Sequence, residues 1–484
     1  MKIQIAAKPL TEIKDGFLVL PVFEDEKQDY GISLVKNYLA DNPKFGKLFE
    51  GQILYSDNSK ILLIGAGKKE KLDFVSLQNL AGAAVRKLLK KSKSLSLVLP
   101  KAGKLSEEEK TYAAALGIEI AAFDPTADFK FKHEPSTLTQ VELLVDRAER
   151  GLMEGLKKGQ IIAESINLTR KLGDLPANIM TPSYFLEVAK KVAKDNKLKI
   201  TILDEKQTKK KGMGAFSGVA QGSEEPSFMI ALEYTGDIKN KDKWAFVGKG
   251  ITFDTGGLSI KPSGGMHEMK YDMTGAAAVM TAIVAVAKLN LKTNVVAVMA
   301  VTENLPGGRA QRPGDIVKTY SGKFAEIMDT DAEGRLVLID AVSYAQKDFK
   351  ANKVIDLATL TGAIIVSLGD HITGVFGNRN EFTKNFMEVS RKYGEKVWEL
   401  PMYDEFDEMI KSQMADIANI GHGGSHRSAA GSITGAKFIE AGVEEGTEWI
   451  HLDIAGTAWD MKPKPYRGVG ATGVGVKTLV ELIS

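Results

Sequence analysis

Residues 244–257 read WAFVGKGITFDTGG, an apolar run followed directly by glycines and charged residues. The run has the length and composition of a buried strand, and similar runs alternate with helical patterns along the second part of the chain. The expected strands are 199–203, 244–247, 295–301, 324–328, 354–358 and 449–454, and the expected helices are 184–196, 275–289, 335–348 and 431–441. This alternation predicts parallel βαβ units, whose functional sites lie beyond the carboxyl ends of the strands.

The first part of the chain is also predicted to be α/β, with strands at 16–22, 60–64 and 95–99 and a helix at 77–90. A helical pattern of apolar residues over 141–172 is expected to link an N-terminal domain, 1–140, to a larger domain, 173–484. Only 9 of the 47 glycines precede residue 151. Because glycine allows tight turns and close approach to a ligand, the larger domain is expected to carry the chemistry.

The composition excludes several kinds of site. The 484 residues include no cysteine and only six histidines. Cysteine zinc sites, iron–sulfur clusters, disulfides and thiol nucleophiles are therefore excluded, and a bound metal would have to be held by carboxylates, His or a less usual ligand. The net charge of +2 gives no electrostatic argument for a nucleic-acid or membrane partner.

No targeting or membrane-spanning segment is predicted. Charged residues interrupt the first fifteen positions, so these residues form no apolar signal core. The longest apolar run, 276–287, is too short to span a bilayer and fits a buried helix. These patterns predict a cytoplasmic protein.

Four carboxylates follow predicted strands in the second part: Asp254, Asp272, Asp331 and Glu333. Such groups are costly among apolar runs unless they bind or pair with something. Their combined charge would balance two divalent cations, and a pair of metal ions can activate water and polarise a carbonyl or phosphoryl group. Asp331 and Glu333 would point the same way in extended backbone. The alternative is that all four are helix caps and surface ion pairs.

Other site patterns fail or are weak. Gly65 and Gly67 resemble half of a dinucleotide fingerprint, but the third glycine position is Lys69. The pair at 267–268 begins a zincin HExxH motif, but position 271 is Tyr. The loop at Lys249 is no Walker A motif because Ile251 stands where Ser or Thr is needed, and no GxSxG esterase motif occurs.

The octapeptide DTDAEGRL at 329–336 is similar to the NTDAEGRL signature of the M17 leucyl aminopeptidases, also called cytosol aminopeptidases. Further motifs of that family occur in the family's order: VGKG at 247–250, FDTGG at 253–257, RPGD at 312–315, ATLTGA at 358–363 and HLDIAGT at 451–457. The resemblance implies a smaller macrodomain-like N-terminal α/β domain. It also implies a larger catalytic α/β domain with a mixed, mainly parallel central sheet flanked by helices.

The resemblance implies a two-metal site that holds Mn²⁺ or Zn²⁺. Asp254 and Glu333 match the carboxylates that bridge both ions, and Lys249 and Asp272 match further ligands of the tighter site. Asp331 matches a ligand of the exchangeable site. Lys249 would have to be neutral to ligate a metal, whereas the residues alone suggest an ion-pair partner.

The resemblance also assigns a reaction. Lys261 and Arg335 match the catalytic pair, with Lys261 stabilising the oxyanion formed when a metal-bridging hydroxide attacks the scissile carbonyl. Arg335 would hold a bicarbonate that acts as general base. The substrate is a peptide that loses its first residue, preferably Leu or another apolar one. The matching substrate-binding positions are Met269, Thr359, Leu360, Gly362, Ala455 and Ala458.

The family assembles as a homohexamer, a dimer of trimers, which the resemblance implies here. Asp329 stands where the family usually has Asn, and it would either change metal affinity or cap the helix. A DNA-binding or regulatory protein of the same family remains an alternative, although the near-neutral charge argues against nucleic acid. A metal phosphohydrolase is a third, weaker alternative, because two-metal carboxylate sites also serve phosphate chemistry.

Overall fold

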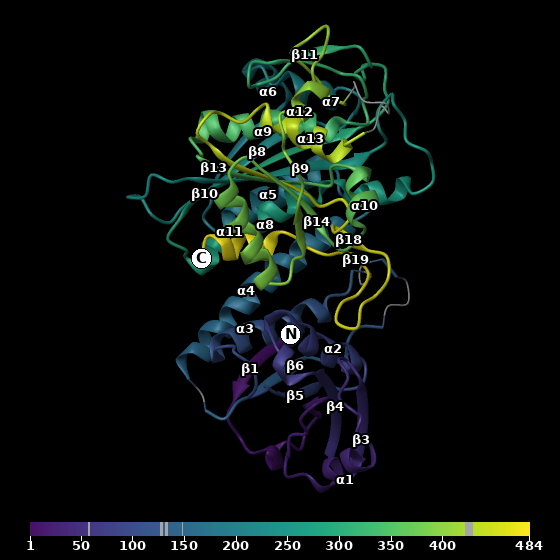
Figure 1. Ribbon diagram of the computed structural model, residues 1–484, viewed down its shortest axis with the longest axis vertical. Helices are drawn as coiled ribbons and strands as arrows, with labels where there is room; N and C mark the ends of the chain where they lie inside the picture. The colour runs from purple at the N-terminus through teal and green to yellow at the C-terminus, as the bar shows by residue number, and fades with distance from the viewer. Residues whose placement is uncertain (57–58, 126–128, 131–133, 148, 422–428) are drawn as a thin grey trace. The chain divides into compact units, whose positions relative to one another are not determined.

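The computed structural model describes residues 1–56, 59–125, 129–130, 134–147, 149–421 and 429–484 (Figure 1). The chain divides into two compact units. The first comprises Met1–Asn167 and Met461–Val469, and the second comprises Leu168–Asp460 and Gly470–Ser484.

The first unit is built on a six-stranded sheet in the order β1-β6-β5-β2-β4-β3. All neighbouring strands pair in parallel except β3 and β4. The strands are β1 (Lys2–Ala6), β2 (Phe17–Phe23), β3 (Gly51–Ser56), β4 (Ser59–Gly67), β5 (Ser94–Val98) and β6 (Gln140–Leu144). Its helices are α1 (Ser33–Asp41), α2 (Phe74–Leu88) and α3 (Glu107–Ala122). The three strands and the helix predicted for this part are confirmed, with shifted ends.

The linking helix was predicted to begin too early. Residues 140–144 form β6, which pairs with both β1 and β5, and helix α4 covers Arg150–Asp174. The apolar residues Val141, Leu143 and Leu144 are buried there. Such a short apolar run fits a helix or a strand equally well, and pairing with two distant strands decides between them.

The second unit contains an eight-stranded sheet in the order β15-β14-β17-β13-β9-β10-β8-β7. Its central strands β17, β13, β9 and β10 are parallel, while β8, β7 and β14 add antiparallel pairs. The strands are β7 (Lys199–Leu203), β8 (Phe228–Thr235), β9 (Trp244–Asp254), β10 (Asn294–Asn304), β13 (Lys353–Ala358), β14 (Thr373–Gly377), β15 (Val397–Glu399) and β17 (Glu448–Asp453). The expected mixed, mainly parallel sheet is confirmed.

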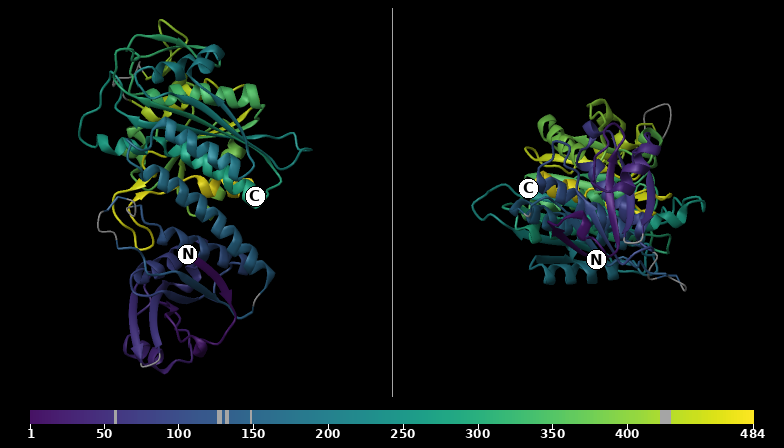
Figure 2. Two further views of the ribbon diagram at one scale, coloured as in Figure 1. Left: turned by 180° about the vertical axis from the view of Figure 1, so that it is seen from behind. Right: turned by 90° about the horizontal axis from the view of Figure 1, so that it is seen from below.

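Helices cover both faces of this sheet (Figures 1 and 2). Alternate residues of β9 point to opposite faces: Ala245 and Val247 pack in one core with α9 (Glu333–Phe349), whereas Gly248 faces Ala276 of α8 (Thr274–Leu289). The longer helices are α5 (Pro182–Asp195), α8 (Thr274–Leu289), α9 (Glu333–Phe349), α11 (Asn380–Lys392) and α13 (Gly431–Glu440). The shorter helices are α6 (Glu205–Lys211), α7 (Gly214–Ala220), α10 (Gly362–Leu368), α12 (Glu405–Met409) and α14 (Val476–Leu482). In the first unit, short 3₁₀ helices lie at Leu10–Glu12 and Lys69–Lys71.

Several helices start where the local sequence provides a cap. Thr181 accepts a hydrogen bond from the backbone N–H of Tyr184 at the start of α5, and Pro182 occupies the first turn. Asp73, Ser106 and Asp204 form capping boxes at α2, α3 and α6. These starts are therefore encoded by a few neighbouring residues.

Two strand predictions were wrong in extent or place. β9 continues to Asp254, so residues 248–254 are strand rather than loop. The strand expected at 324–328 is β12 (Phe324–Glu326), which pairs with β11 (Ile316–Lys318) and β16 (Ile417–Ala418) in a separate three-stranded sheet. A two-stranded sheet of β18 (Trp459–Asp460) and β19 (Gly470–Ala471) completes the unit.

One segment of the described chain is long and apolar enough to cross a membrane. It is Met266–Leu289, which joins the 3₁₀ helix η3 (Met266–Met273) to α8. However, 83% of its most apolar window is buried inside the fold. The segment is thus the core helix that the sequence predicts at 275–289.

Candidate metal centre and active site

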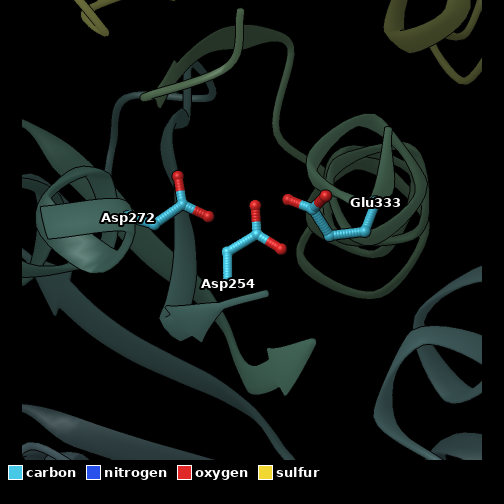
Figure 3. Close-up of side chains that lie close together, drawn as sticks. All are labelled: Asp254, Asp272 and Glu333. Carbon is cyan, nitrogen blue, oxygen red and sulfur yellow. The ribbon is translucent and has the colours of Figure 1, made fainter. Parts of the chain in front are cut away.

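Three elements bring three carboxylates to one point (Figure 3). Asp254 ends β9, Asp272 lies on η3, and Glu333 is the first residue of α9. One oxygen from each carboxylate lies within 4.8 Å of the others, and all three residues are buried. These are three of the four carboxylates singled out in the sequence.

Glycines allow this convergence. A Cβ at Gly248 would lie 2.5 Å from the Cα of Ala276, so only glycine lets β9 approach the start of α8 this closely. Gly256 has a φ of +87°, and its N–H donates to Oδ1 of Asp254 over 2.9 Å. The chain therefore turns immediately after Asp254 while its backbone holds that carboxylate.

Two lysines connect the carboxylates in pairs. Nζ of Lys249 lies 2.8 Å from both Oδ2 of Asp272 and Oε1 of Glu333. Nζ of Lys261 lies 2.8 Å from Oδ2 of Asp254 and 2.5 Å from Oδ1 of Asp331. Asp331 therefore joins the group through Lys261. Four carboxylates face two ammonium groups, which leaves the group net negative.

Burial and mutual repulsion set the protonation of the acids. Burial, together with Asp254 and Glu333, raises the pKa of Asp331 to about 7. Burial and the neighbouring carboxylates also raise the pKa of Asp272 and of Glu333. A divalent cation would relieve this repulsion, and buried carboxylate oxygens are suitable ligands for Mn²⁺ or Zn²⁺. The donor set thus fits a metal centre.

The lysines respond in the opposite sense. Burial disfavours the ammonium of Lys249, but Asp272 and Glu333 outweigh burial and raise its pKa. Asp254 and Glu333 likewise outweigh burial at Lys261 and raise its pKa. Both side chains are cationic in the metal-free protein, as expected of ion-pair partners.

Extended backbone was predicted to orient Asp331, but a turn orients it instead. Residues 329–332 form a turn before α9 and are not extended. Oδ1 of Asp329 accepts a hydrogen bond from the N–H of Asp331 over 2.9 Å and so shapes this turn. Nδ2 of Asn304, at the end of β10, donates to Oδ1 of Asp254 over 2.8 Å and to the carbonyl of Thr330 over 3.0 Å. Asn304 was not singled out in the sequence.

Arg335 lies on α9, two residues after Glu333. It is 6% exposed, and its Nη1 donates to the carbonyl of Asn419 over 2.8 Å. Its Nε has no hydrogen-bond partner among the residues that the structure describes. Burial lowers its pKa to about 10, which leaves the guanidinium charged at neutral pH. Arg335 is not among the residues that line the adjoining cavity.

A cavity of about 410 Å³ opens beside the carboxylates. Of the six predicted substrate-binding residues, five line it: Met269, Thr359, Leu360, Gly362 and Ala455. Ala458 is 1% exposed and does not, while its neighbour Trp459 does. The indole of Trp459 stacks on Tyr271 with ring centres 5.0 Å apart. The sequence offered one signal for Trp459, its place two residues after the HLDIAGT motif.

The segment that lines one side of this cavity is anchored by Asp453, the last residue of β17. Oδ1 of Asp453 accepts from the N–H groups of Leu360 (3.1 Å) and Thr361 (3.4 Å), and Oδ2 accepts from the Thr361 hydroxyl over 2.6 Å. The same segment contacts one of the four clustered carboxylates, because Oγ1 of Thr359 donates to Oδ1 of Asp272 over 2.7 Å. Asp453 lies within a quoted motif, but its role was not predicted.

Buried carboxylates at the carboxyl end of a mainly parallel α/β sheet, with paired lysines and an open cavity, fit the site of a metal-dependent hydrolase. The family is given by comparison with known proteins. A model of the catalytic domain of the cytosol aminopeptidase family matches residues 167–480, and a model of that family's N-terminal domain matches residues 46–127. The chain belongs to this family, M17, and is a metal-dependent aminopeptidase that acts on peptides.

Similar proteins extend over the whole chain. A probable cytosol aminopeptidase of Solibacter usitatus (strain Ellin6076) is 40% identical over 489 residues, covering 100% of this chain and 99% of the relative. A probable cytosol aminopeptidase of Rickettsia bellii (strain OSU 85-389) is 39% identical over 471 residues, covering 95% and 92%.

Two solved structures share the fold. A mutant of tomato leucine aminopeptidase matches with a TM-score of 0.88 and 32% identity, covering 100% of this chain and 96% of its own. The bottromycin maturation enzyme BotP in complex with Mn matches with a TM-score of 0.86 and 28% identity, covering 96% and 98%. These comparisons lend no support to the DNA-binding alternative.

Proposed function

We propose that the protein is a dinuclear-metal aminopeptidase that removes Leu and other apolar residues from the N-termini of peptides. The observation that carries this proposal is the pairing of four carboxylates with two lysines beside one cavity. A metal phosphohydrolase is disfavoured, because apolar groups such as Met269 and Ile365 line the same cavity.

Two divalent ions would be held by Asp254, Asp272, Asp331 and Glu333, with Lys249 as a further ligand. When bound, the ions polarise the scissile carbonyl and lower the pKa of water. Mn²⁺ and Zn²⁺ are the proposed ions, and the similarity to BotP in complex with Mn supports the former. Lys249 can ligate only after its ammonium loses a proton, because a protonated amine has no free electron pair.

The chain's own cations would complete the reaction. Lys261 is 20% exposed at the cavity, where its ammonium can stabilise negative charge that develops on the carbonyl oxygen. Arg335 is proposed to hold a bicarbonate that acts as general base, as the family resemblance implies. Its Nε has no partner among the described residues, which supports this role, since a buried guanidinium donor left unpaired favours an anion.

The first side chain of the peptide would lie against Met269, Thr359, Leu360, Gly362 and Ala455. Trp459 adds an aromatic wall that the family resemblance did not include. A pocket of this kind discriminates weakly between apolar side chains, by about 1–3 kcal/mol per methylene. We expect broad specificity with Leu among the preferred residues.

The protein is further proposed to be cytoplasmic and to assemble as a homohexamer, a dimer of trimers. The names of its relatives support the location, and the family supports the assembly. Sedimentation analysis tests the assembly. A mass of about six times 52.5 kDa is expected, and a monomer at micromolar concentration would contradict it.

Hydrolysis of Leu-p-nitroanilide tests the function. The protein loaded with Mn²⁺ or Zn²⁺ should release p-nitroaniline, and full chelation should abolish the release. Glu333→Ala should be inactive in every metal. Glu388→Gln, an exposed carboxylate change on α11, is the matched control and should retain wild-type activity. Activity that survives both chelation and Glu333→Ala would rule out the proposal.

A further inference from the structure

One buried asparagine contacts both halves of the site. Asn419 follows β16 and is 0% exposed. Its side chain contacts the turn that carries the metal-binding carboxylates, and its backbone contacts Arg335. The mechanism proposed above assigns it no role.

The side chain holds the turn before α9 at both ends. Oδ1 of Asn419 accepts from the N–H groups of Met328 (2.7 Å) and Asp329 (3.2 Å). Nδ2 donates to the carbonyls of Asp329 (2.5 Å) and Ala332 (3.4 Å). Ala332 caps α9 without a side-chain hydrogen bond of its own. Asn419 therefore pairs backbone N–H and carbonyl groups of the turn that precedes α9.

The backbone of the same residue holds the arginine. The Asn419 carbonyl accepts from Nη1 of Arg335 over 2.8 Å. The Asn419 N–H donates to the carbonyl of Glu326 over 3.0 Å, which attaches the residue to β12. Asn419 therefore contacts both the turn that carries Asp331 and the side chain of Arg335.

We propose that Asn419 is a positioning residue that aligns the metal-binding turn at 329–333 with Arg335. The inference rests on the proposed function of this site and adds a residue to it. Outer contacts that orient metal ligands typically change metal affinity or activity by 10–100-fold when removed. Loss of the Asn419 side chain should loosen Asp331 and Glu333 without removing either ligand.

Asn419→Ala tests the proposal against a matched control. Asn294, the first residue of β10, makes the same kind of contacts at the opposite end of that strand from Asn304. Its Nδ2 donates to the carbonyls of Asp237 (2.7 Å) and Asn240 (2.9 Å), and its Oδ1 accepts from the N–H of Asp237. Asn294→Ala thus removes an equivalent buried asparagine from another loop.

The measurements are Mn²⁺ affinity, by titration followed by electron paramagnetic resonance, and kcat and KM for Leu-p-nitroanilide. Asn419→Ala should weaken Mn²⁺ binding and lower kcat, each by about 10–100-fold, with a smaller change in KM. Asn294→Ala should change neither by more than about twofold.

Wild-type affinity and kcat in Asn419→Ala would overturn the proposal, and so would equal losses in both alanine variants. If Asn419→Ala does not fold, Asn419→Ser, which retains one hydrogen-bonding group, replaces it under the same criteria. The metal titration separates this inference from the proposed function. A wild-type protein that binds Mn²⁺ but cleaves no peptide would refute the function, whereas the affinity comparison would still test Asn419.

Discussion

Each acid of the site is paired with a lysine before any ion binds. Lys249 bridges Asp272 and Glu333, and Lys261 bridges Asp254 and the more exposed Asp331. Removing a carboxylate from water costs several kcal/mol, and the attraction to a paired lysine offsets part of that cost. The pairs explain how the chain can assemble a highly acidic centre in the absence of metal, and they place the lysines where the reaction would use them.

Asn304 is expected to be essential to the charge balance between the carboxylates and lysines of the site. Asn304→Asp replaces the donor to Asp254 by a carboxylate and so adds a fifth negative group to the centre. Leaving buried acceptors unpaired costs about 1–3 kcal/mol, so the metal-free variant should unfold at lower temperature. Asn378→Asp, which alters contacts with Thr447 and Trp449, is the control. With each variant compared with the wild type at the same Mn²⁺ concentration, charge repulsion is the cause if Mn²⁺ removes most of the stability deficit of Asn304→Asp and leaves that of Asn378→Asp unchanged.

Asp340 lies on α9, away from the four carboxylates of the site. It should make the free energy of unfolding depend on pH. Burial raises its pKa to about 7, although the N–H groups of Phe216 and Tyr320 donate to it. The folded chain therefore holds a proton between about pH 4 and pH 7 that the unfolded chain has released. The stability due to this proton is fully present below about pH 4 and is lost as pH rises through 7, by at most about 1.4 kcal/mol per unit.

Urea unfolding at several pH values with a chelator present measures this effect. All four tryptophans, 244, 398, 449 and 459, lie in the second unit, so their fluorescence reports on it alone. The stability of the wild type relative to Asp340→Asn should decrease from about pH 5 to pH 8. The exposed change Glu388→Gln should show no such trend. A difference independent of pH would mean that Asp340 keeps an ordinary pKa.

At the level of residues, the sequence predicted the carboxylates and lysines but not what holds them. Asp254 and Glu333 stand in motifs with fixed neighbours, and their convergence was expected. Asn304 and Asn419 act through contacts to segments 26 to 93 positions away, for which a single sequence carries no local signal. Which side chain faces the cavity is likewise not fixed by a neighbouring motif, since Trp459 lines it and Ala458, next to the HLDIAGT motif, does not.

At the level of elements, the segment 359–362 depends on one carboxylate at the end of β17. Asp453→Ala removes the acceptor for two N–H groups and one hydroxyl of that segment. We expect kcat/KM for Leu-p-nitroanilide to fall by about 10–100-fold, because the cavity wall and Thr359 would shift. Asp453→Asn keeps most acceptor contacts and should recover part of the activity. Equal, small effects of both changes would show that the segment holds its shape unaided.

The elements themselves were largely predictable, and their arrangement was not. Apolar runs such as 199–203 and helical patterns such as 275–289 are local properties, and both are confirmed as β7 and α8. The place of β12 in a small separate sheet depends on pairing with β16, more than 90 residues later in the chain. The extension of β9 through two glycines depends on pairing with β10.

At the level of the whole molecule, metal binding should stabilise the second unit. An ion that binds only the folded state at about 100 times its dissociation constant adds about 2.7 kcal/mol to the free energy of unfolding. Tryptophan fluorescence during urea unfolding, with Mn²⁺ and then with a chelator, measures the difference. Glu333→Ala should show little or no gain from Mn²⁺. The metal-free protein should remain folded, because the lysines balance part of the acidic charge.

The buried segment Met266–Leu289 has a consequence for synthesis in the cell. Its helix α8 packs against β13 and α14, and α14 emerges from the ribosome roughly 190 residues after Leu289. At about 5–20 residues per second, that interval lasts roughly 10–40 s. During this time a segment apolar enough for a membrane lacks some of the elements that bury it in the folded chain. We therefore expect the yield of folded protein to depend on translation speed and chaperone supply, because both determine how long this segment stays exposed.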